Sequence, residues 1–532
     1  MENKVTLTIN GRTLETESGS TVLKTALANG IHIPHYCWHP GLSVAGNCRM
    51  CLVEIEGIPK LQTACSTAVR DGMVVRSDTE RVKTAVRHVL EFLLINHPVD
   101  CPVCDQAGEC GLQEYYMMVG RYDSRFAENK VTKHKKATPI GPWVMLDQER
   151  CILCSRCVRF TREISKSHEM AIFQRGDHCE IDVFPGQQLD NPYSANVIDV
   201  CPVGALTCRD FRYQCRVWYL KRTPSVCPGC SRGCSIEIHH SPIRPQKGKG
   251  RRVFRFKPRY NPEVNHWWLC DAGRYGYKAI DDGRLRACAV AENGGRREVY
   301  NSEAVTALRE ALRGSEARRT AYLVSPDSTN EELFAARKLF RDTLNIRCWL
   351  PDIGVRTGNE DDFLIRQDKH PNTRGAMAIF GLSEADLVPA GEIASRATAE
   401  QISLLLVNRH DLAESALAEL KSTGCRIVYL GTNVSRTSAA AALTIALASF
   451  AEMEGTFTNF EGRVQRIRLA VPLSGQSEPE WAVLDKLAQQ LGLNLSFTSP
   501  GQIFGLMRQE VIAFGPLDFH AIPPTGVTIA HE

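Results

Sequence analysis

The first residues of the chain alternate between apolar and polar side chains. Val5 to Ile9 follow the period of two that is typical of a strand, Asn10-Gly11 is a strong hairpin turn, and RTLETE continues the strand pattern. Thr21 to Asn29 then predict a helix that closes at Gly30. We therefore expect the chain to open with a small sheet and one helix.

A helical period replaces this alternation between Thr79 and Asn96. Ser77 and Glu80 have the spacing of a capping box at the start of this helix, and Pro98 marks its end. Apolar residues recur every three or four positions, at Val82, Val86, Val89, Leu90, Leu93 and Leu94.

After about residue 276 short apolar runs alternate with amphipathic stretches. The runs Ala321–Ser325, Ser403–Val407 and Arg426–Gly431 predict strands, and Asn330–Leu344 is amphipathic. Strands that alternate with helices indicate a parallel α/β layer.

Composition narrows the class of protein. The 532 residues leave room for several domains, and 43% hydrophobic with 23% charged residues is an ordinary globular balance. A net charge of +4 does not favour nucleic-acid binding, and the most apolar stretch, near Ala439 to Phe450, is too short to span a membrane. MENKVTLTING lacks a secretory signal pattern, so we expect a reducing cytoplasm. The 21 cysteines are then more plausible as metal ligands than as disulfides.

Most of the cysteines lie in the first half of the chain, in four groups. The first group is Cys37, Cys48, Cys51 and Cys65. Its loop GNCRMC offers backbone N–H groups to sulfur, and four thiolates on a sheet with a long first loop suit a [2Fe–2S] centre. A zinc site is the alternative, but zinc sites usually contain two closely spaced pairs and this group has one.

A histidine opens the second group, which is His97, Cys101, Cys104 and Cys110. A single histidine at a helix end is more often a cap or a core residue than a ligand. Here it precedes three cysteines that lack a fourth partner, so we predict a [4Fe–4S] site with one imidazole ligand. The neutral nitrogen removes one negative charge and should raise the reduction potential.

The third group has the ligand pattern of a bacterial ferredoxin, with a proline after the remote cysteine. It consists of Cys151, Cys154, Cys157 and Cys201 and predicts one [4Fe–4S] cluster. Three further cysteines fall outside the pattern and are expected to be small buried apolar residues: Cys179, Cys208 and Cys215.

The fourth group has three closely spaced cysteines and one distant cysteine, Cys227, Cys230, Cys234 and Cys270. We predict a third [4Fe–4S] cluster here. Tetrahedral zinc is a stronger alternative than in the other groups, because this spacing also suits four thiolates around one ion.

Together the groups resemble the large iron–sulfur subunit, of the 75-kDa type, of bacterial respiratory complex I, the proton-pumping NADH:quinone oxidoreductase. The resemblance covers about the first 280 residues and rests on LSVAGNCRMCLVEIEG, VLEFLLINHPVDCPVCDQAGEC, RCILCSRCVRF, FQRGDH, LDNPYSANVIDVCPVGALT and WWLCDAGRYGY. EGTFTNFEGRVQ (Glu454 to Gln465) is a later family-like stretch. The resemblance implies that the first three centres lie on the electron route and that the fourth lies off it.

The resemblance also implies the fold. We expect α+β iron–sulfur modules, β-grasp ferredoxin-like and then bacterial-ferredoxin-like, followed by a reduced α/β molybdopterin-oxidoreductase-like domain. The expected domains are 1–78 ([2Fe–2S]), 79–120 ([4Fe–4S] with one histidine and three cysteines), 140–215 (ferredoxin-like), 220–276 (fourth cluster) and 277–532 (shortened α/β domain). The last contains only Cys288, Cys348 and Cys425, widely separated, so we expect no molybdopterin and a role in packing and subunit contact.

The predicted function is electron transfer from a flavin subunit through iron–sulfur clusters toward quinone, in a complex that translocates protons. The sequence shows no nucleophile constellation and no G-x-G-x-x-G loop after a strand, so we expect no bond-making site on this chain. NADH and flavin then belong to a partner subunit, and quinone-side iron–sulfur subunits are further expected partners, with no nucleic acid. The resemblance places the chain in the peripheral arm, on the cytoplasmic side of the inner (plasma) membrane.

Two other classes of function fit the sequence less well. Iron-only hydrogenases and formate dehydrogenases resemble parts of this sequence, but the former need cysteine motifs in the C-terminal half. The latter need a metal-binding cysteine followed by histidine, whereas Trp349 follows Cys348 and Arg426 follows Cys425. A zinc scaffold would require all four groups to be structural, which the proline after Cys201 and the histidine of the second group disfavour.

Overall fold

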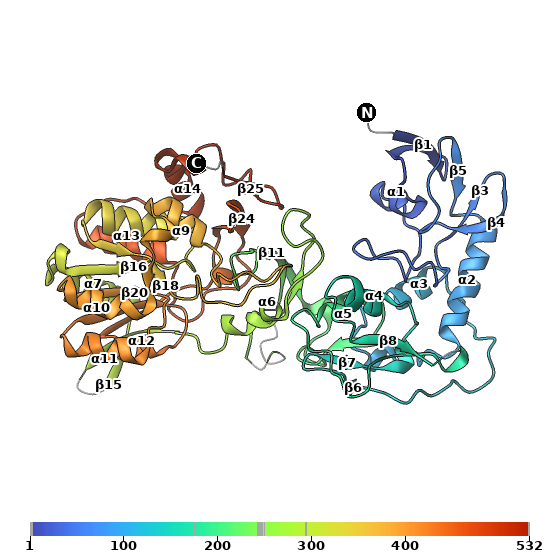
Figure 1. Cartoon of the computed structure of the whole chain (residues 1–532), viewed down its shortest axis with the longest axis horizontal. Helices are drawn as coiled ribbons and strands as arrows, with labels where there is room; N and C mark the ends of the chain where they lie inside the picture. Colours follow the sequence, from blue (N-terminus) through green and yellow to red (C-terminus); the bar gives the residue numbers. More distant parts are fainter. Residues whose placement is uncertain (1–3, 175, 242–247, 249, 293–294, 530–532) are drawn as a thin grey trace. The chain divides into compact units, whose positions relative to one another are not determined.

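A computed structural model describes residues 4–174, 176–241, 248, 250–292 and 295–529 (Figure 1). The chain divides into two compact units, Met1–Tyr219 (unit one) and Leu220–Glu532 (unit two). No helix among the described residues is long and apolar enough to cross a membrane.

Unit one opens with a five-stranded sheet in the order β2-β1-β5-β3-β4. Its strands are β1 (Lys4–Ile9), β2 (Arg12–Glu17), β3 (Leu52–Ile55), β4 (Ile58–Thr63) and β5 (Met73–Arg76). Asn10 and Gly11 have φ of 48° and 78°, as a tight hairpin requires, and α1 (Val22–Ala28) packs Val22 and Leu23 into the core of this sheet. The predicted hairpin and first helix are confirmed.

The second helix, α2 (Glu80–Leu94), begins within one residue of the predicted Thr79, but its cap differs from the one predicted. Thr79 is its N-cap, and the Thr79 hydroxyl accepts a hydrogen bond from the backbone N–H of Val82 at 3.2 Å. The capping box expected from Ser77 and Glu80 is therefore wrong. Ser77 is instead held by Asn10, whose side-chain amide donates to the Ser77 hydroxyl at 2.9 Å and accepts from its N–H at 2.8 Å.

The remainder of unit one consists of short elements connected by long loops. A three-stranded sheet has the order β10-β7-β6, and β8 pairs with β9 in a separate hairpin. The elements are α3 (Gly111–Val119), β6 (Thr138–Pro139), β7 (Val144–Leu146), α4 (Arg156–Glu163), β8 (Met170–Phe173), β9 (Glu180–Val183), α5 (Asn196–Val200) and β10 (Leu206–Cys208).

Unit two begins with a three-stranded antiparallel sheet and a short helix. They are β11 (Lys221–Val226), β12 (Ser235–His240), β13 (Val253–Pro258) and α6 (Asp271–Tyr275). A seven-stranded sheet follows, in the order β15-β14-β22-β21-β20-β16-β17. Its strands are β14 (Cys288–Glu292), β15 (Gly295–Val299), β16 (Thr320–Leu323), β17 (Arg347–Trp349), β20 (Leu404–Asn408), β21 (Arg426–Gly431) and β22 (Leu443–Ala446).

The large sheet separates two apolar cores, because successive side chains of a strand point to opposite faces. On β20, Leu404 and Leu406 belong to one core, and Leu405 and Val407 belong to the other. Figure 1 shows helices on both sides of the sheet. One core includes residues of α7 (Asn301–Arg313), α8 (Asn330–Ala336), α9 (Thr373–Phe380), α13 (Glu480–Gln490) and α14 (Pro500–Glu510); the other includes residues of α10 (Ile393–Ala399) and α11 (Glu414–Ser422).

The parallel α/β layer predicted from the sequence is confirmed, since β22, β21, β20, β16 and β17 pair in parallel. The amphipathic stretch from Asn330 continues beyond α8 as a π-helical segment, Arg337–Thr343. The remaining elements are β18 (Pro351–Asp352), β19 (Val388–Pro389), α12 (Arg436–Ala440), β23 (Gly455–Thr458), β24 (Arg463–Ile467) and β25 (Val527–Thr528).

Candidate metal centres

The four cysteines of the first group lie in direct contact. The Cys37 thiol shares hydrogen bonds with those of Cys48 and Cys65, and Cys51 shares one with Cys65. These bonds lower the pKa of Cys37 and Cys51 and raise the pKa of Cys48 and Cys65. The backbone N–H of Cys37 also points at Cys48 Sγ, 3.4 Å away. The four thiols therefore lie close together, and their mutual hydrogen bonds favour the thiolate at Cys37 and Cys51 and the thiol at Cys48 and Cys65.

The second group is less tightly gathered. His97, Cys101 and Cys110 line one cavity between α2 and α3, whereas Cys104 is not among its lining residues. His97 Nδ1 is buried and has no hydrogen-bond partner among the described residues, and burial lowers the pKa of His97 to about 4. The imidazole is therefore neutral near pH 7, which is the form that binds a metal.

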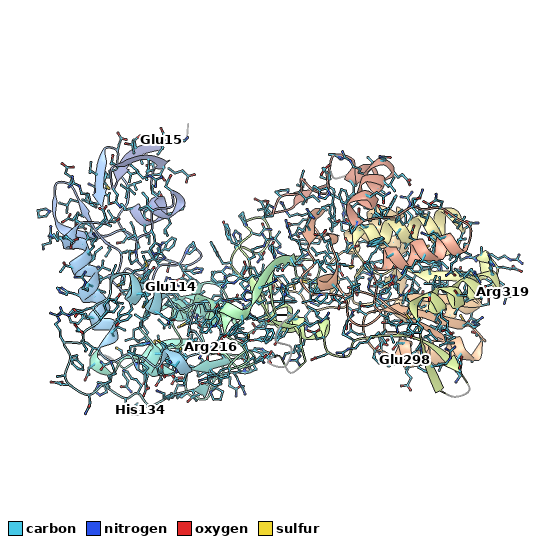
Figure 2. All side chains as sticks on the ribbon, turned by 180° about the vertical axis from the view of Figure 1, so that it is seen from behind. Glu15, Glu114, His134, Arg216, Glu298 and Arg319 are labelled. Carbon is cyan, nitrogen blue, oxygen red and sulfur yellow. The ribbon has the colours of Figure 1, made fainter. Side chains whose placement is uncertain are left out.

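Cys104 lies against the loop of the third group. A Cβ added at Gly204 would collide with Cys104 Sγ, so only glycine fits at this position of the CPVGA segment. Arg216, labelled in Figure 2, donates to the backbone carbonyls of Cys104 and Pro102. These contacts fix the Cys104 backbone beside the residues that follow Cys201.

The third group encloses a small cavity, which all four of its cysteines line. Leu146, Ile152 and Ile181 contribute to the apolar walls. Burial raises the pKa of all four thiols, that of Cys201 to about 12. The ligand set and the dry walls together fit a thiolate-bound cluster.

The loop of the third group has an unusual backbone. Leu153 and Ser155, between the cysteines, have φ of 53° and 61°, a conformation that costs non-glycine residues on the order of 1 kcal/mol or more. The Leu153 N–H donates to Cys151 Sγ at 3.4 Å. The turned backbone thus brings an amide to a sulfur, as suits an iron–sulfur site.

The fourth group depends on a glycine of α6. A Cβ added at Gly273 would lie 2.9 Å from Cys227 Sγ and 3.3 Å from Cys270 Sγ. The Gly273 N–H donates to Cys270 Sγ at 3.3 Å. Burial raises the pKa of Cys227, Cys234 and Cys270, the last to about 11. Sequence reasoning did not single out Gly273, although it follows Cys270 by only three residues.

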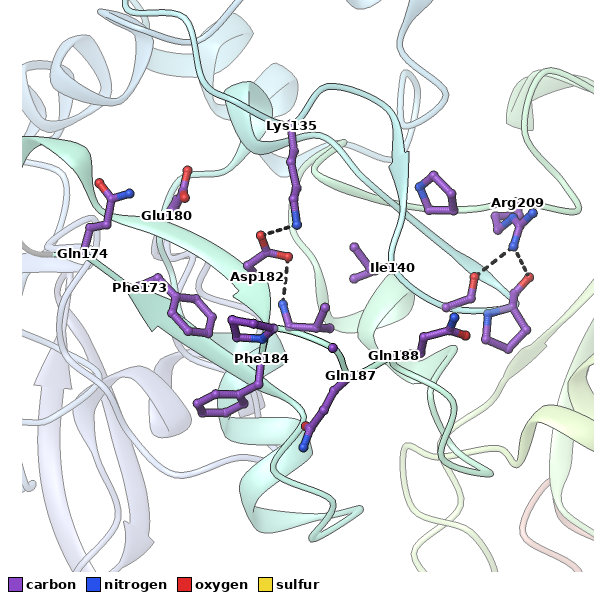
Figure 3. A pocket seen from close by; sticks show the side chains of 16 residues that line it. Lys135, Ile140, Phe173, Gln174, Glu180, Asp182, Phe184, Gln187, Gln188 and Arg209 are labelled. Carbon is purple, nitrogen blue, oxygen red and sulfur yellow. Dashed lines mark hydrogen bonds and ion pairs between the residues drawn. The ribbon is translucent and has the colours of Figure 1, made fainter.

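The remaining cysteines of unit one differ in burial. Cys215 is buried as expected, but Cys179 and Cys208 are partly exposed; Cys179 directly precedes β9, and Cys208 is the last residue of β10. Among the described residues, no three His, Cys, Asp or Glu side chains converge on the space of a single metal ion. A separate cavity, lined by both polar and apolar residues including Lys135, Asp182 and Phe184, contains none of the predicted ligands (Figure 3).

Five family models match successive segments of the chain. "2Fe-2S iron-sulfur cluster binding domain" matches residues 2–80, and "NADH-ubiquinone oxidoreductase-G iron-sulfur binding region" matches 87–125. "NADH-quinone oxidoreductase subunit 3, ferredoxin-like domain" matches 141–207. "Molybdopterin oxidoreductase Fe4S4 domain" matches 220–282, and "Molybdopterin oxidoreductase" matches 384–490.

Curated relatives agree with these matches. The G subunit of the NADH-quinone oxidoreductase of Rickettsia felis is 38% identical over 337 residues, 63% of this chain and 49% of that protein. Its namesake from Streptomyces coelicolor is 39% identical over 367 residues, 68% of this chain and 42% of that protein. The chain is related to the G subunits of NADH-quinone oxidoreductase. The expected fold class, iron–sulfur domains followed by a molybdopterin-oxidoreductase-like domain, is confirmed.

The chain spans about half the length of the first relatives it matches, 49% and 54% for two Rickettsia proteins. A solved structure of an NAD+-reducing [NiFe]-hydrogenase in the H2-reduced state is 31% identical and covers 40% of this chain and 91% of that chain. Its TM-score of 0.37 is too low to support an argument from the fold.

Proposed function

We propose that the chain is an electron-transfer subunit of an NADH:quinone oxidoreductase. It would pass electrons from a flavin subunit toward quinone, in a complex that couples this transfer to proton translocation. The observation that carries the proposal is the third group, where four cysteines line one apolar cavity. An iron–sulfur cluster, when bound, supplies reversible one-electron transfer. The chain's own contribution is to hold the ligands, exclude water and direct amides and charges at sulfur.

The proposed ligands fall into four sets, for one [2Fe–2S] and three [4Fe–4S] clusters. Three of these assignments are each supported by one observation. The thiols of the first group are in contact, the imidazole of His97 in the second group is neutral, and Gly273 leaves space beside the sulfurs of the fourth group. The sets are Cys37, Cys48, Cys51 and Cys65; His97, Cys101, Cys104 and Cys110; Cys151, Cys154, Cys157 and Cys201; and Cys227, Cys230, Cys234 and Cys270. No molybdopterin is proposed.

The proposal extends to domains, partners and location. The domains are those predicted from the sequence, and the division at Tyr219/Leu220 falls in the gap between two of them. The partners are a flavin- and NADH-binding subunit and the quinone-side iron–sulfur subunits. Relatives named as subunits of the oxidoreductase support this assembly. The chain would then lie in the peripheral arm, on the cytoplasmic side of the membrane.

The metal content of the chain tests the proposal. Iron, zinc and molybdenum are measured together on protein isolated without oxygen. We expect about 14 irons per chain and no molybdenum, from one [2Fe–2S] and three [4Fe–4S] clusters. About 10 irons with one zinc would make one of the [4Fe–4S] sites structural, most directly the fourth. Stoichiometric molybdenum, or zinc in all four groups, would overturn the proposal.

A further inference from the structure

Two arginines of α4 lie between the first and third cysteine groups. Arg159 is buried, with 4% of its surface exposed. Its Nη2 donates to the backbone carbonyl of Cys37 and, at 3.4 Å, to that of Cys154. Its Nη1 donates to the carbonyl of Ser43, and its Nε donates to the hydroxyl of Ser155 at 3.2 Å. One guanidinium therefore joins a ligand residue of the first group to a ligand residue of the third.

Arg156, less than one turn earlier on the same helix, repeats the arrangement. Its Nη1 donates to the carbonyl of Val200 at 3.1 Å, and its Nη2 donates to the carbonyl of Trp38. Val200 directly precedes Cys201, and Trp38 directly follows Cys37. Both arginines thus contact the backbone at or beside one proposed ligand of each group.

Among the described residues, the two positive charges have no carboxylate partner. Arg159 donates to three carbonyls and a hydroxyl, and neither arginine forms an ion pair within the described part of the chain. The Nε of Arg156 is buried without any hydrogen-bond partner there. Burying a cation is costly unless an anion faces it. The proposed ligands nearest to them are Cys37, Cys154 and Cys201, at or beside whose backbone both guanidinium groups donate, so a thiolate-ligated cluster in either group would supply the missing negative charge.

We propose that Arg156 and Arg159 are positioning residues that set the reduction potentials of the first and third centres together. This inference rests on the proposed ligation of both centres. Reduction adds negative charge to a centre, and a nearby cation in a medium of low dielectric constant makes that addition more favourable. Because each guanidinium lies between the two groups, removing its charge should lower both potentials and not only one.

The test compares substitutions that separate charge from hydrogen bonding. Arg159→Gln keeps an amide donor and removes the charge, whereas Arg159→Lys keeps the charge. The full chain is purified in its complex without oxygen, and midpoint potentials are measured by EPR at controlled potential. We expect Arg159→Gln and Arg156→Gln to shift the first and third centres to more negative potentials. Arg159→Lys should stay closer to the unsubstituted protein, and the second and fourth centres should not shift.

A matched control is Arg209→Gln. Arg209 also donates to two backbone carbonyls, those of Gly141 at 2.9 Å and Pro142 at 3.2 Å, but neither is adjacent to a cysteine of the four groups (Figure 3). This variant should leave all four potentials unchanged. A shift in both the first and third centres in this control would mean that any lost arginine charge acts at long range, which would overturn the assignment.

The proposal is wrong if both glutamine variants leave the two potentials unchanged, or if only one centre shifts. If Arg159→Gln does not retain both centres, the comparison uses Arg156→Gln and Arg159→Lys. Arg156→Gln should then shift both potentials to more negative values, and Arg159→Lys should stay closer to the unsubstituted protein. A failure of the proposed electron-transfer function gives a different result from a failure of this inference. In that case the unsubstituted protein itself would lack one of the two EPR signals or its iron.

Discussion

At the scale of single residues, the candidate centres depend on small features beside the ligands. The candidate cysteines could be identified from their spacing, because short intervals between cysteines are typical of metal and cluster sites; their role as ligands stays a prediction. Gly204 and Gly273 could not, since their importance lies in sulfur atoms that approach them in space. For Gly204 that sulfur belongs to Cys104, which is 100 residues away in sequence. Likewise, the burial expected for Cys179 and Cys208 is wrong: both lie at strand boundaries, one before β9 and one at the end of β10, and both are partly exposed.

Gly273→Ala should disrupt the fourth centre. The added Cβ would lie 2.9 Å from Cys227 Sγ, a distance that real Cβ contacts do not tolerate, so a sulfur must move. We expect a loss of about 4 irons per chain, the content of one [4Fe–4S] cluster, measured by iron analysis. Gly276→Ala is the control, because a Cβ there meets nothing within 4 Å. Full iron content in Gly273→Ala would contradict the assignment of this space to a cluster.

His97→Cys should retain a cluster in the second group and lower its potential. The thiolate adds one negative charge where the neutral imidazole stood, and negative charge disfavours reduction. Redox titration followed by EPR measures the shift, and iron analysis confirms that the cluster remains. An unchanged potential with full iron content would exclude His97 as a ligand.

At the scale of elements, strands and helices were predicted better than their ends. β20 and β21 were predicted from apolar runs, because the strands of a parallel sheet are buried on both faces. The N-cap of α2 was misassigned because Ser77 is held by Asn10, 67 residues earlier. Local spacing contains no information about such a partner, so the choice between Ser77 and Thr79 as the cap could not be made from the sequence.

A half-buried ion pair next to β16 should make the stability of unit two depend on pH. His370 Nδ1 lies 2.8 Å from Asp327 Oδ1. Burial alone would lower the pKa of His370, but the Asp327 charge and hydrogen bond, with the Ile353 carbonyl, raise it to about 9. A raised folded-state pKa gives stability that is complete below the unfolded value of about 6.5 and is lost as pH rises toward about 9. Because the Asp327 side chain is partly exposed and solvent screens the pair, the contribution is on the order of 2 kcal/mol.

His370→Gln should therefore remove most of the decline in stability between pH 6.5 and 9. Urea unfolding at several pH values, followed by a probe in unit two, measures that decline. His520→Gln is the control, because His520 is exposed and should leave the decline unchanged. A decline of the same size in His370→Gln would assign the pH dependence to other groups.

At the scale of the whole molecule, the segments around the candidate centres differ from the large sheet in how much regular structure they contain. The sheet of unit two lies between two apolar cores that hold no proposed ligand. In unit one, the segments around Cys101–Cys110 and Cys151–Cys157 have short helices and few regular hydrogen bonds. Where a chain segment buries little apolar surface, metal binding supplies folding free energy that the segment lacks.

Removing iron with a chelator should accordingly affect the chain unevenly. Hydrogen–deuterium exchange with mass spectrometry, on protein with and without iron, measures the outcome peptide by peptide. Amides of α4 should lose protection, because α4 carries Cys157 and follows the loop of the third group. Amides of β20 should keep it, because Leu404 to Val407 are buried between apolar layers. Equal loss in both elements would mean that the clusters stabilise the chain as one cooperative body, contrary to the division at Tyr219/Leu220.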